Sequence, residues 1–378
     1  MGHDMDKTLA ETIGKCYQCG VCSGICPVVR VRKEFSPRRI LMSVNLGHAP
    51  EIVSSGALWN CLTCGACQVK CPMDVDFLGL VRNLRPQMLE QGVLYCPSHE
   101  GLLGPLYNIM KHEAIKPKRK NFLGEDIRTN DHSDTLYFTG CIPYMDVIFK
   151  EDLGFEGLAI VNNSVRLLNA IGIEPAIADQ EKCCGHDFLW RGRQDIFEEL
   201  ARHNESFLKQ YNRIVVSCPE CYRTLAVDYK EKLGINLNVI HISELLTENI
   251  DKLQFMSNGD DVTFHDSCRL GRYMKVYDPP RNLLEVAGYE VKEMAKNREE
   301  SLCCGISAFI GCNDESKEIR RRLMKEALKT GVKTLVTSCP KCQIHLKCLQ
   351  KDESEPEYPL RIVDLSTVVL ERLKEVEN

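Results

Sequence analysis

The pattern of apolar and polar positions changes near Thr135. Before it, apolar residues recur at helical spacing in short stretches, for example at Phe77, Val81 and Leu84. After it, short apolar runs rich in β-branched residues alternate with helical patterns. Strands that alternate with helices predict a parallel sheet covered by helices, so we expect a helical N-terminal part followed by α/β structure.

The α/β pattern occurs twice. The expected strands are residues 136–138, 214–216, 262–264 and 334–336, with an extended segment at 173–178. The expected helices are residues 164–171, 196–211, 280–287, 320–330 and 365–376. Two copies of one strand–helix pattern predict two pseudo-symmetric lobes that face each other.

These changes of pattern predict an α+β protein in four parts. They are a helical module (1–95), a linker (96–134) and two α/β lobes with parallel sheets (135–255 and 256–378). In the module, Ser36 before Pro37 predicts a helix start. In the linker, the basic run 116–120 predicts a solvated face, with a docking patch for an acidic partner as the alternative.

Composition and charge exclude several classes of protein. The 378 residues carry a net charge of −5, which gives no electrostatic case for nucleic-acid binding. No apolar run reaches the ~18 residues of a membrane helix, so we expect no transmembrane segment. The first residues lack the layout of a secretory signal, which predicts a cytoplasmic protein, peripheral on the inner face of the membrane where a partner holds it.

The chain contains 21 cysteines, and their spacing indicates a chemical function. Disulfides are rare in the cytosol, so spaced cysteines there indicate metal ligands or redox groups. Two runs in the helical module follow the pattern C-x₂-C-x₂-C-x₃-C-P and resemble those of bacterial-type ferredoxins. The first run is Cys16, Cys19, Cys22 and Cys26, and the second is Cys61, Cys64, Cys67 and Cys71.

The two ferredoxin-type runs predict two cubane [4Fe-4S] clusters. In such pairs the fourth cysteine of each run ligates the other cluster. Gly20 and Gly65 allow the tight turns that wrap a cluster. The first expected ligand set is Cys16, Cys19, Cys22 and Cys71, and the second is Cys61, Cys64, Cys67 and Cys26.

Each α/β copy also carries five cysteines in the same order. A single cysteine follows the first strand, a Cys-Cys-Gly comes next, and a Cys-Pro-x-Cys follows it after 34 residues in one copy and 35 in the other. The first set is Cys141, Cys183, Cys184, Cys218 and Cys221, and the second is Cys268, Cys303, Cys304, Cys339 and Cys342. All single cysteines and Cys-Pro-x-Cys turns follow expected strand ends, where five ligands can converge.

The number of thiolates in each set indicates the metal. Structural zinc takes four ligands, whereas soft thiolates also select iron–sulfur clusters. Five cysteines per set therefore favour a cluster with several metals, with zinc in one set as the alternative. Cys96, Cys312 and Cys348 belong to no set and are expected to be ordinary buried thiols.

Two ferredoxin-type runs followed by two Cys-Cys-Gly modules resemble the heterodisulfide reductase family, in particular the fused, D-type form of its catalytic iron–sulfur subunit. The resemblance spans Cys16 to Cys348 and implies that each five-cysteine set binds a non-cubane [4Fe-4S] cluster. It implies a reductase that cleaves a CoB-S-S-CoM-like heterodisulfide in methanogenesis, with small anionic thiols as products. One departure is the segment 305–309, where relatives often have a glycine-rich loop.

The implied mechanism needs two electrons per disulfide. Two clusters on opposite sides of the S–S bond would each receive one sulfur and supply one electron, and the cubanes would refill them. His186 and His265 are candidates for proton supply or for hydrogen bonds to a cluster. The cations near the motifs are expected either to hold anionic groups of the substrate or to offset the clusters' charge. They are Arg191, Arg193, Arg269, Arg272 and Lys341.

Two other functions remain open. The chain is alternatively a non-catalytic electron carrier between a flavoprotein dehydrogenase, of glycolate, lactate or glycerol-3-phosphate type, and a quinone or membrane partner. A third candidate is a sulfite-reduction-linked complex that handles a trisulfide. No nucleotide-binding motif occurs, so a flavin or nicotinamide is expected on a partner. The expected redox partner subunit is either a flavoprotein or a membrane cytochrome b.

Overall fold

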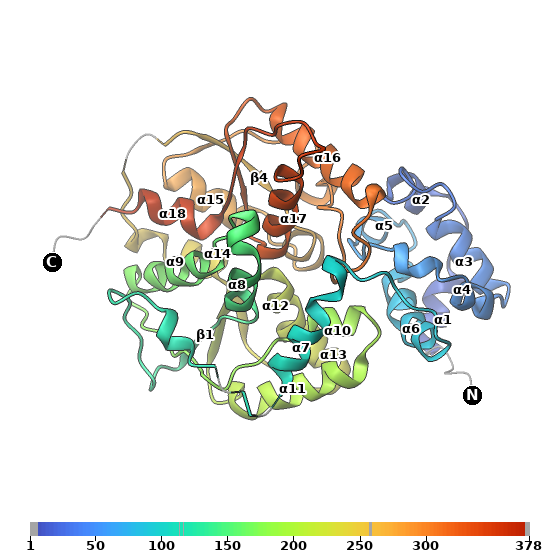
Figure 1. The fold of residues 1–378 in the computed structure, drawn as a ribbon, viewed down its shortest axis with the longest axis horizontal. Coiled ribbons are helices and arrows are strands. Elements are labelled where there is room, and N and C mark those ends of the chain that lie inside the picture. Colours follow the sequence, from blue (N-terminus) through green and yellow to red (C-terminus); the bar gives the residue numbers. More distant parts are fainter. Residues whose placement is uncertain (1–6, 113, 116, 257–258, 375–378) are drawn as a thin grey trace.

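The helical module and the two lobes are seen side by side in the computed structural model (Figure 1). The structure describes residues 7–112, 114–115, 117–256 and 259–374. The expectations for the first six residues, for Lys116 and for the end of the helix at 365–376 lie outside the described residues. No helix in these described ranges is long and apolar enough to cross a membrane.

The N-terminal module is built from short helices around the two ferredoxin-type runs. Its elements are α1 (Lys7–Gly14), α2 (Val21–Ile25), α3 (Pro37–Asn45), α4 (Ala49–Ser55), η1 (Ala57–Asn60), α5 (Ala66–Val69) and α6 (Phe77–Glu90). The predicted start of α3 is confirmed, because the Ser36 hydroxyl accepts a hydrogen bond from the Arg39 amide at 3.3 Å. Phe77, Val81 and Leu84 form the buried face of α6.

The linker is more ordered than its proline and glycine content indicates. It contains η2 (His99–Gly101), α7 (Leu103–Lys111) and η3 (Arg119–Phe122). The prediction that the basic run is a solvated face is wrong at Arg119, which is 1% exposed. Its guanidinium forms a buried ion pair with Glu181 at 3.1 Å and donates to the Gly140 carbonyl at 3.0 Å. Arg119 therefore ties the linker to the loop before Cys141.

The first lobe contains a parallel sheet of order β1-β2-β3. Its strands are β1 (Thr135–Phe138), β2 (Arg213–Val216) and β3 (Val239–His241). The expected extended segment at 173–178 makes only a single bridge, between Leu136 and Ala176. The helices are α8 (Ile142–Leu153), α9 (Gly157–Ala170), α10 (His186–Trp190), α11 (Gln194–Leu208), α12 (Pro219–Arg223), α13 (Tyr229–Leu233) and α14 (Ile242–Glu248). A π-helical turn, η4 (Thr224–Asp228), links α12 to α13, and η5 (Ile250–Lys252) follows α14.

The second lobe contains a parallel sheet of order β5-β4-β6-β7. Its strands are β4 (Asp261–His265), β5 (Glu290–Val291), β6 (Thr334–Thr337) and β7 (Arg361–Asp364). The helices are the π-helical η6 (Arg269–Tyr273), α15 (Asp278–Val286), the 3₁₀ turn η7 (Arg298–Glu300), α16 (Asp314–Leu328), α17 (Pro340–Gln350) and α18 (Leu365–Arg372). The predicted α+β class with two parallel-sheet lobes is confirmed, whereas the residue limits of the four parts stay a prediction.

Helices of the two lobes pack against each other across their interface. Helix α18 of the second lobe packs on α9 of the first, where Asn163 donates to the Thr367 hydroxyl at 3.2 Å. Helix α14 of the first lobe packs on α15 of the second, where the Thr247 hydroxyl donates to the Pro279 carbonyl at 3.1 Å. Each lobe therefore completes the other's core.

The buried carboxyl of Asp364, at the start of α18, gives the protein a testable pH dependence. Burial raises the pKa of Asp364, which caps α18, to about 6, and its Oδ2 is buried without a hydrogen-bond partner among the described residues. Because the folded pKa lies above the unfolded one, the penalty is absent below pH ~4 and complete above pH ~6. We expect Asp364→Asn to stabilise the protein by up to ~3 kcal/mol at pH 7 and by nothing at pH 4. Thermal unfolding of both proteins at the two pH values measures this, and an equal effect at both would contradict it.

Candidate metal centres

The first ferredoxin-type centre lies near the surface of the module. Its cavity is lined by five cysteines from both runs: Cys16, Cys19, Cys22, Cys67 and Cys71. Cys19 is exposed and the other four are half-buried. The fourth cysteine of the second run, Cys71, thus lies with the first three of the first run, and Cys67 also borders this cavity.

The second ferredoxin-type centre lies deeper. A separate cavity is lined by Cys26, Cys61, Cys64 and Cys67. Burial raises the pKa of Cys26 to about 12 and that of Cys61 to about 11, so a metal would be needed to hold them as thiolates. The four cysteines expected for each cubane cluster line one cavity, although Cys67 borders both, and ligation by these groups stays a prediction.

The backbone of both runs turns in the same way. Gln18 and Thr63, which precede the second cysteine of each run, have positive φ angles of 65° and 49°. Gly20 and Gly65, which follow it, have φ angles of 86° and 78°. The glycines were predicted to form tight turns, but the left-handed Gln18 and Thr63 carry no sequence signal because these side chains rarely adopt that conformation.

The first five-cysteine set converges at the carboxyl end of its sheet. Cys141 follows β1, Cys218 follows β2, and the Cys183 and Cys184 pair lies in the loop before α10. The Cys221 thiol lies 3.5 Å from the Cys184 sulfur, too far for a disulfide bond of about 2.05 Å. Hydrogen bonds from Cys183 and Cys221 lower the pKa of Cys184 to about 7.

The second set repeats this arrangement. Cys268 follows β4, and Cys339 begins α17, where its sulfur accepts a hydrogen bond from the Cys342 amide at 3.4 Å. Hydrogen bonds from Cys303 and Cys342 lower the pKa of Cys304 to about 6, as at Cys184. In both sets the second cysteine of the pair has a lowered pKa, and five sulfurs per set exceed the four ligands of structural zinc.

The second ferredoxin-type centre adjoins the second five-cysteine set. The thiols of Cys64 and Cys303 are hydrogen-bonded to each other. Arg272, four residues after Cys268, donates to the carbonyl of Cys64 at 2.7 Å. The second ferredoxin-type centre and the second five-cysteine set are therefore direct neighbours.

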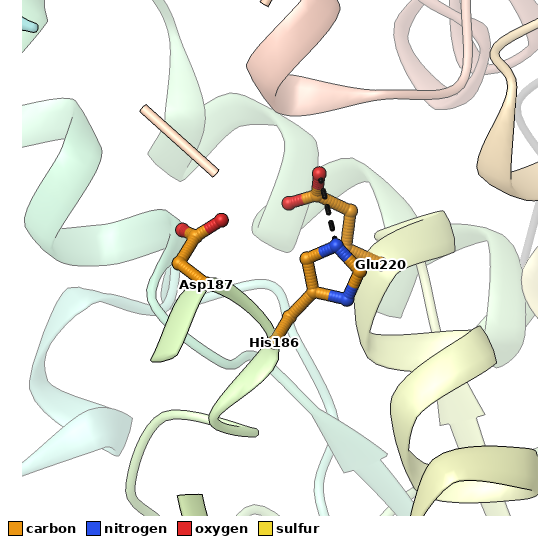
Figure 2. Close-up of side chains that lie close together, drawn as sticks. All are labelled: His186, Asp187 and Glu220. Atoms are coloured by element: carbon orange, nitrogen blue, oxygen red, sulfur yellow. Dashed lines mark ion pairs between the residues drawn. The ribbon is translucent and has the colours of Figure 1, made fainter. Parts of the chain in front are cut away.

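A buried group of charges lies between the two five-cysteine sets. Lys341, from the second Cys-Pro-x-Cys turn, lies 2.5 Å from Asp187 and 2.6 Å from Glu220, which occupies the equivalent place in the first turn. The carboxylates raise the pKa of Lys341 despite its burial, and Tyr107 of α7 donates to Asp187. Figure 2 shows His186, Asp187 and Glu220 around one point, with His186 Nε2 3.5 Å from Glu220. These three side chains have the composition of a cation site, and the Lys341 ammonium pairs with its two carboxylates.

Arg269 connects three of the centres. Its guanidinium lies between the rings of Trp190 and Tyr273, at 4.7 and 4.3 Å from their centroids. It donates to the hydroxyl of Thr63, within the second ferredoxin-type run, at 2.8 Å, and to His186 Nε2 at 3.2 Å. It also follows Cys268 directly, so one buried cation contacts the surroundings of the second cubane centre and of both five-cysteine sets.

Known proteins share these cysteine-rich parts. A cysteine-rich domain family matches residues 135–226 and 262–347, and a 4Fe-4S dicluster domain family matches residues 12–75. The D-type subunit of the dihydromethanophenazine:CoB–CoM heterodisulfide reductase of Methanosarcina acetivorans is 30% identical over 304 residues, which cover 76% of this chain and 71% of the relative. The chain belongs to the family of D-type heterodisulfide reductase subunits.

Other relatives of this D-type chain carry different names. The B-type subunit of the fumarate reductase (CoM/CoB) of Methanothermobacter marburgensis is 29% identical, with 88% of this chain and 67% of the relative covered. The EtfAB:quinone oxidoreductase of Syntrophomonas wolfei is 25% identical, with 94% of this chain and 58% of the relative covered. The family is one of iron–sulfur oxidoreductases, and it includes subunits of larger complexes.

The cations that the sequence singled out are mostly tied to backbone carbonyls in this D-type chain. Arg191 donates to the carbonyls of Ala308 and Phe309, and Arg272 to those of Cys64 and Ser301. Arg193 lies on the surface, paired with Asp195. Lys341 and Arg269 are the two that lie between the cysteine sets.

Both candidate histidines are buried and hydrogen-bonded. Burial lowers the pKa of His186, whose ring contacts Thr224 at 2.9 Å in addition to Arg269. His265 contacts the Leu302 carbonyl at 3.0 Å, and burial lowers its pKa too. Both rings are therefore neutral at pH 7, and each is held in place by its partners.

Three further observations correct or extend the sequence predictions. The expectation that the three remaining cysteines are buried is wrong, because Cys96 is exposed while Cys312 and Cys348 are half-buried. In the segment 305–309, Ala308 and Phe309 have φ angles of 45° and 53°, so two non-glycine residues adopt the conformation that glycine favours. The functional candidates that the sequence missed are Asp187, Glu220, Tyr107 and Thr63.

Proposed function

We propose that this chain reduces a heterodisulfide of two small anionic thiols, of the CoB-S-S-CoM type, between its two lobes. The reaction is RSSR′ + 2e⁻ + 2H⁺ → RSH + R′SH. The proposal includes two cubane [4Fe-4S] clusters in the module and one non-cubane [4Fe-4S] cluster on each five-cysteine set. The observation that supports this proposal is that both five-cysteine sets are complete. A non-catalytic electron-transfer subunit needs no second set of this kind.

The chain's own residues would prepare the site for a substrate that becomes negatively charged. When bound, the clusters would supply the electrons, one at a time. Lys341 places a buried positive charge between the two sets, where two thiolates would be released, and a nearby cation makes a thiolate a better leaving group. Arg269 adds a second buried cation beside Cys268. Asp187 and Glu220 hold Lys341 in place.

The order of the centres supports a linear electron route. The exposed Cys19 lies at one end, and the second ferredoxin-type centre is buried behind it. Cys64 and Cys303, which are neighbours, then lead into the second set. The first set, beyond Lys341, would be reached last, so the two five-cysteine sets would have different roles.

We expect Cys26→Ala to damage the cluster of Cys61, Cys64 and Cys67 and to spare the one nearest to Cys16. The reason is that Cys26 lines the cavity of the second centre although it belongs to the first run. Paramagnetic resonance of the reduced variant identifies the lost signal. Cys96→Ser, at an exposed cysteine outside all sets, is the matched control, and loss of the first-run cluster alone would contradict the grouping.

The proposed reaction is tested anaerobically with a reduced one-electron dye. Oxidation of the dye on addition of CoB-S-S-CoM, with release of both thiols, is the expected result. Iron and zinc analysis of the same sample is the control for loading, with about sixteen irons expected from four clusters. A fully iron-loaded protein that ignores disulfides would refute the proposal, and zinc in place of iron would refute the cluster assignment.

The alternative is a non-catalytic electron-transfer subunit that links a flavoprotein to a quinone or membrane partner. Two observations favour it. One relative is named EtfAB:quinone oxidoreductase. In addition, the ion pairs of Lys341 with Asp187 and Glu220 occupy the position between the sets that a substrate would need. Electron uptake from a reduced flavoprotein without any disulfide turnover would support this alternative.

A further inference from the structure

The outer ferredoxin-type centre is surrounded by exposed apolar side chains. Tyr17, Val21 and Met73 line the same cavity as Cys16 and Cys19, and they are 60%, 42% and 39% exposed. Cys19 itself is exposed, whereas all cysteines of the second centre except the half-buried Cys67 are buried. An electron donor therefore comes closest to a cluster at this rim, which we call the outer rim and define as Tyr17, Cys19, Val21, Arg38 and Met73.

The segment that forms the outer rim is basic although the chain as a whole is acidic. Residues 7–39 contain seven lysines and arginines and only two acidic residues, whereas the net charge of the whole chain is −5. Arg38 lines the rim cavity and is exposed, and Lys15 is exposed next to Cys16. Arg38 and Lys15 thus place two exposed cations beside an apolar centre, which is complementary to a protein whose own redox centre is surrounded by carboxylates.

We propose that the outer rim is the docking surface for an acidic electron-carrier protein, which delivers electrons to the first cubane centre. This inference rests on the proposed function, because it assigns the point at which electrons for disulfide reduction enter. Each encounter transfers one electron: the reduced carrier is oxidised, the first centre is reduced, and the oxidised carrier dissociates. Two such encounters supply the two electrons for one disulfide, and the protons come from solvent.

The proposed surface differs from the basic run of the linker. Arg119 of that run is buried in its ion pair with Glu181, so it offers no charge to a partner. The cavity of the outer rim is instead lined by residues of the module, among them residues of α2 and α3 (Figure 1). A carrier bound there would leave the region between the lobes free for a substrate.

Charge reversal at the rim tests the proposal with the cluster-loaded protein and a reduced two-cluster ferredoxin of acidic surface as the probe. Arg38→Glu and Lys15→Glu are each expected to weaken ferredoxin binding, measured by anaerobic calorimetry, about tenfold and to remove part of its salt dependence. Tyr17→Ser is expected to weaken binding without changing the salt dependence. Lys333→Glu, an exposed lysine before β6 in the second lobe, is the matched control, with a change below about twofold.

The ratio of ferredoxin-driven to dye-driven electron uptake separates this inference from the proposed function. A rim variant should lower this ratio, whether or not any disulfide is reduced. If the rim and control variants bind the ferredoxin equally well, the docking proposal is wrong, even if the dye-driven reaction succeeds. Rim-dependent binding to vesicles with anionic lipid, without rim-dependent binding to the ferredoxin, would overturn it in favour of a membrane contact.

Discussion

Cys303→Ser is expected to abolish disulfide reduction and also to stop electrons from reaching the first five-cysteine set. Cys303 belongs to the second set and is hydrogen-bonded to Cys64 of the second ferredoxin-type centre. Loss of this cysteine would therefore remove one site of sulfur capture and interrupt the shortest electron route. The expected loss of turnover is at least ~10³-fold, because the one remaining cluster site could not carry out the two-electron cleavage by itself.

Cys183→Ser provides the informative comparison. It should abolish turnover to the same extent, but the second set should still be reduced by the dye, because the route through Cys64 is intact. Paramagnetic resonance after stepwise reduction distinguishes the two variants. Cys348→Ser, at a half-buried cysteine outside all sets, should retain activity. Full activity in Cys303→Ser would exclude the two-site mechanism.

Lys341→Met is expected to destabilise the protein by about 3–5 kcal/mol, the usual result of removing one partner from a buried ion pair. Asp187 would remain buried and Glu220 half-buried, with like charges close together. Burial already raises the pKa of Glu220, and without the ammonium the lowered pKa of Asp187 would rise as well. The penalty would then be complete above the raised pKa and would disappear as the pH falls below ~4, so the difference from wild type should shrink in acid.

Thermal unfolding under anaerobic conditions, at pH 7.5 and at the lowest pH that keeps the protein folded, measures this difference. Lys351→Met, at the exposed end of the same helix, is the control and should change little. Adding Glu220→Gln to Lys341→Met should restore part of the stability, because it removes one uncompensated charge. An unchanged midpoint in Lys341→Met would show that the ion pairs are unimportant for stability.

The cysteines were predictable from the sequence to the extent that chemistry restricts their spacing. A cluster needs several thiolates within a few ångströms. Cys141, Cys184 and Cys221 of the first set therefore recur in the same order as Cys268, Cys304 and Cys342 of the second. This repeat could be recognised from the sequence, without knowledge of the fold. The strand ends before Cys141 and Cys218 followed from short β-branched runs. These signals are local, and the structure confirms the strands and helices that rest on them.

The charged groups between the lobes were not predictable in the same way. Glu220 and Lys341 each look like an ordinary charged residue in a Cys-Pro-x-Cys turn, and only the facing of two lobes makes them partners. Arg119 looked like part of a solvated basic run because its partner Glu181 lies far along the chain. Long-range ion pairs leave no periodic pattern in a sequence, so neither the partner nor the burial could be derived.

The packing of helices between the lobes also has a consequence for folding during translation. A ribosome releases the first lobe, including α9, long before α18 emerges, yet α18 covers the side of α9 in the finished protein. The first lobe therefore cannot complete its core before α18 has been synthesised. This differs from domains that fold one after another during translation. Iron loading of the first five-cysteine set would accordingly belong to a late stage of biogenesis, when both lobes have left the ribosome and assemble together.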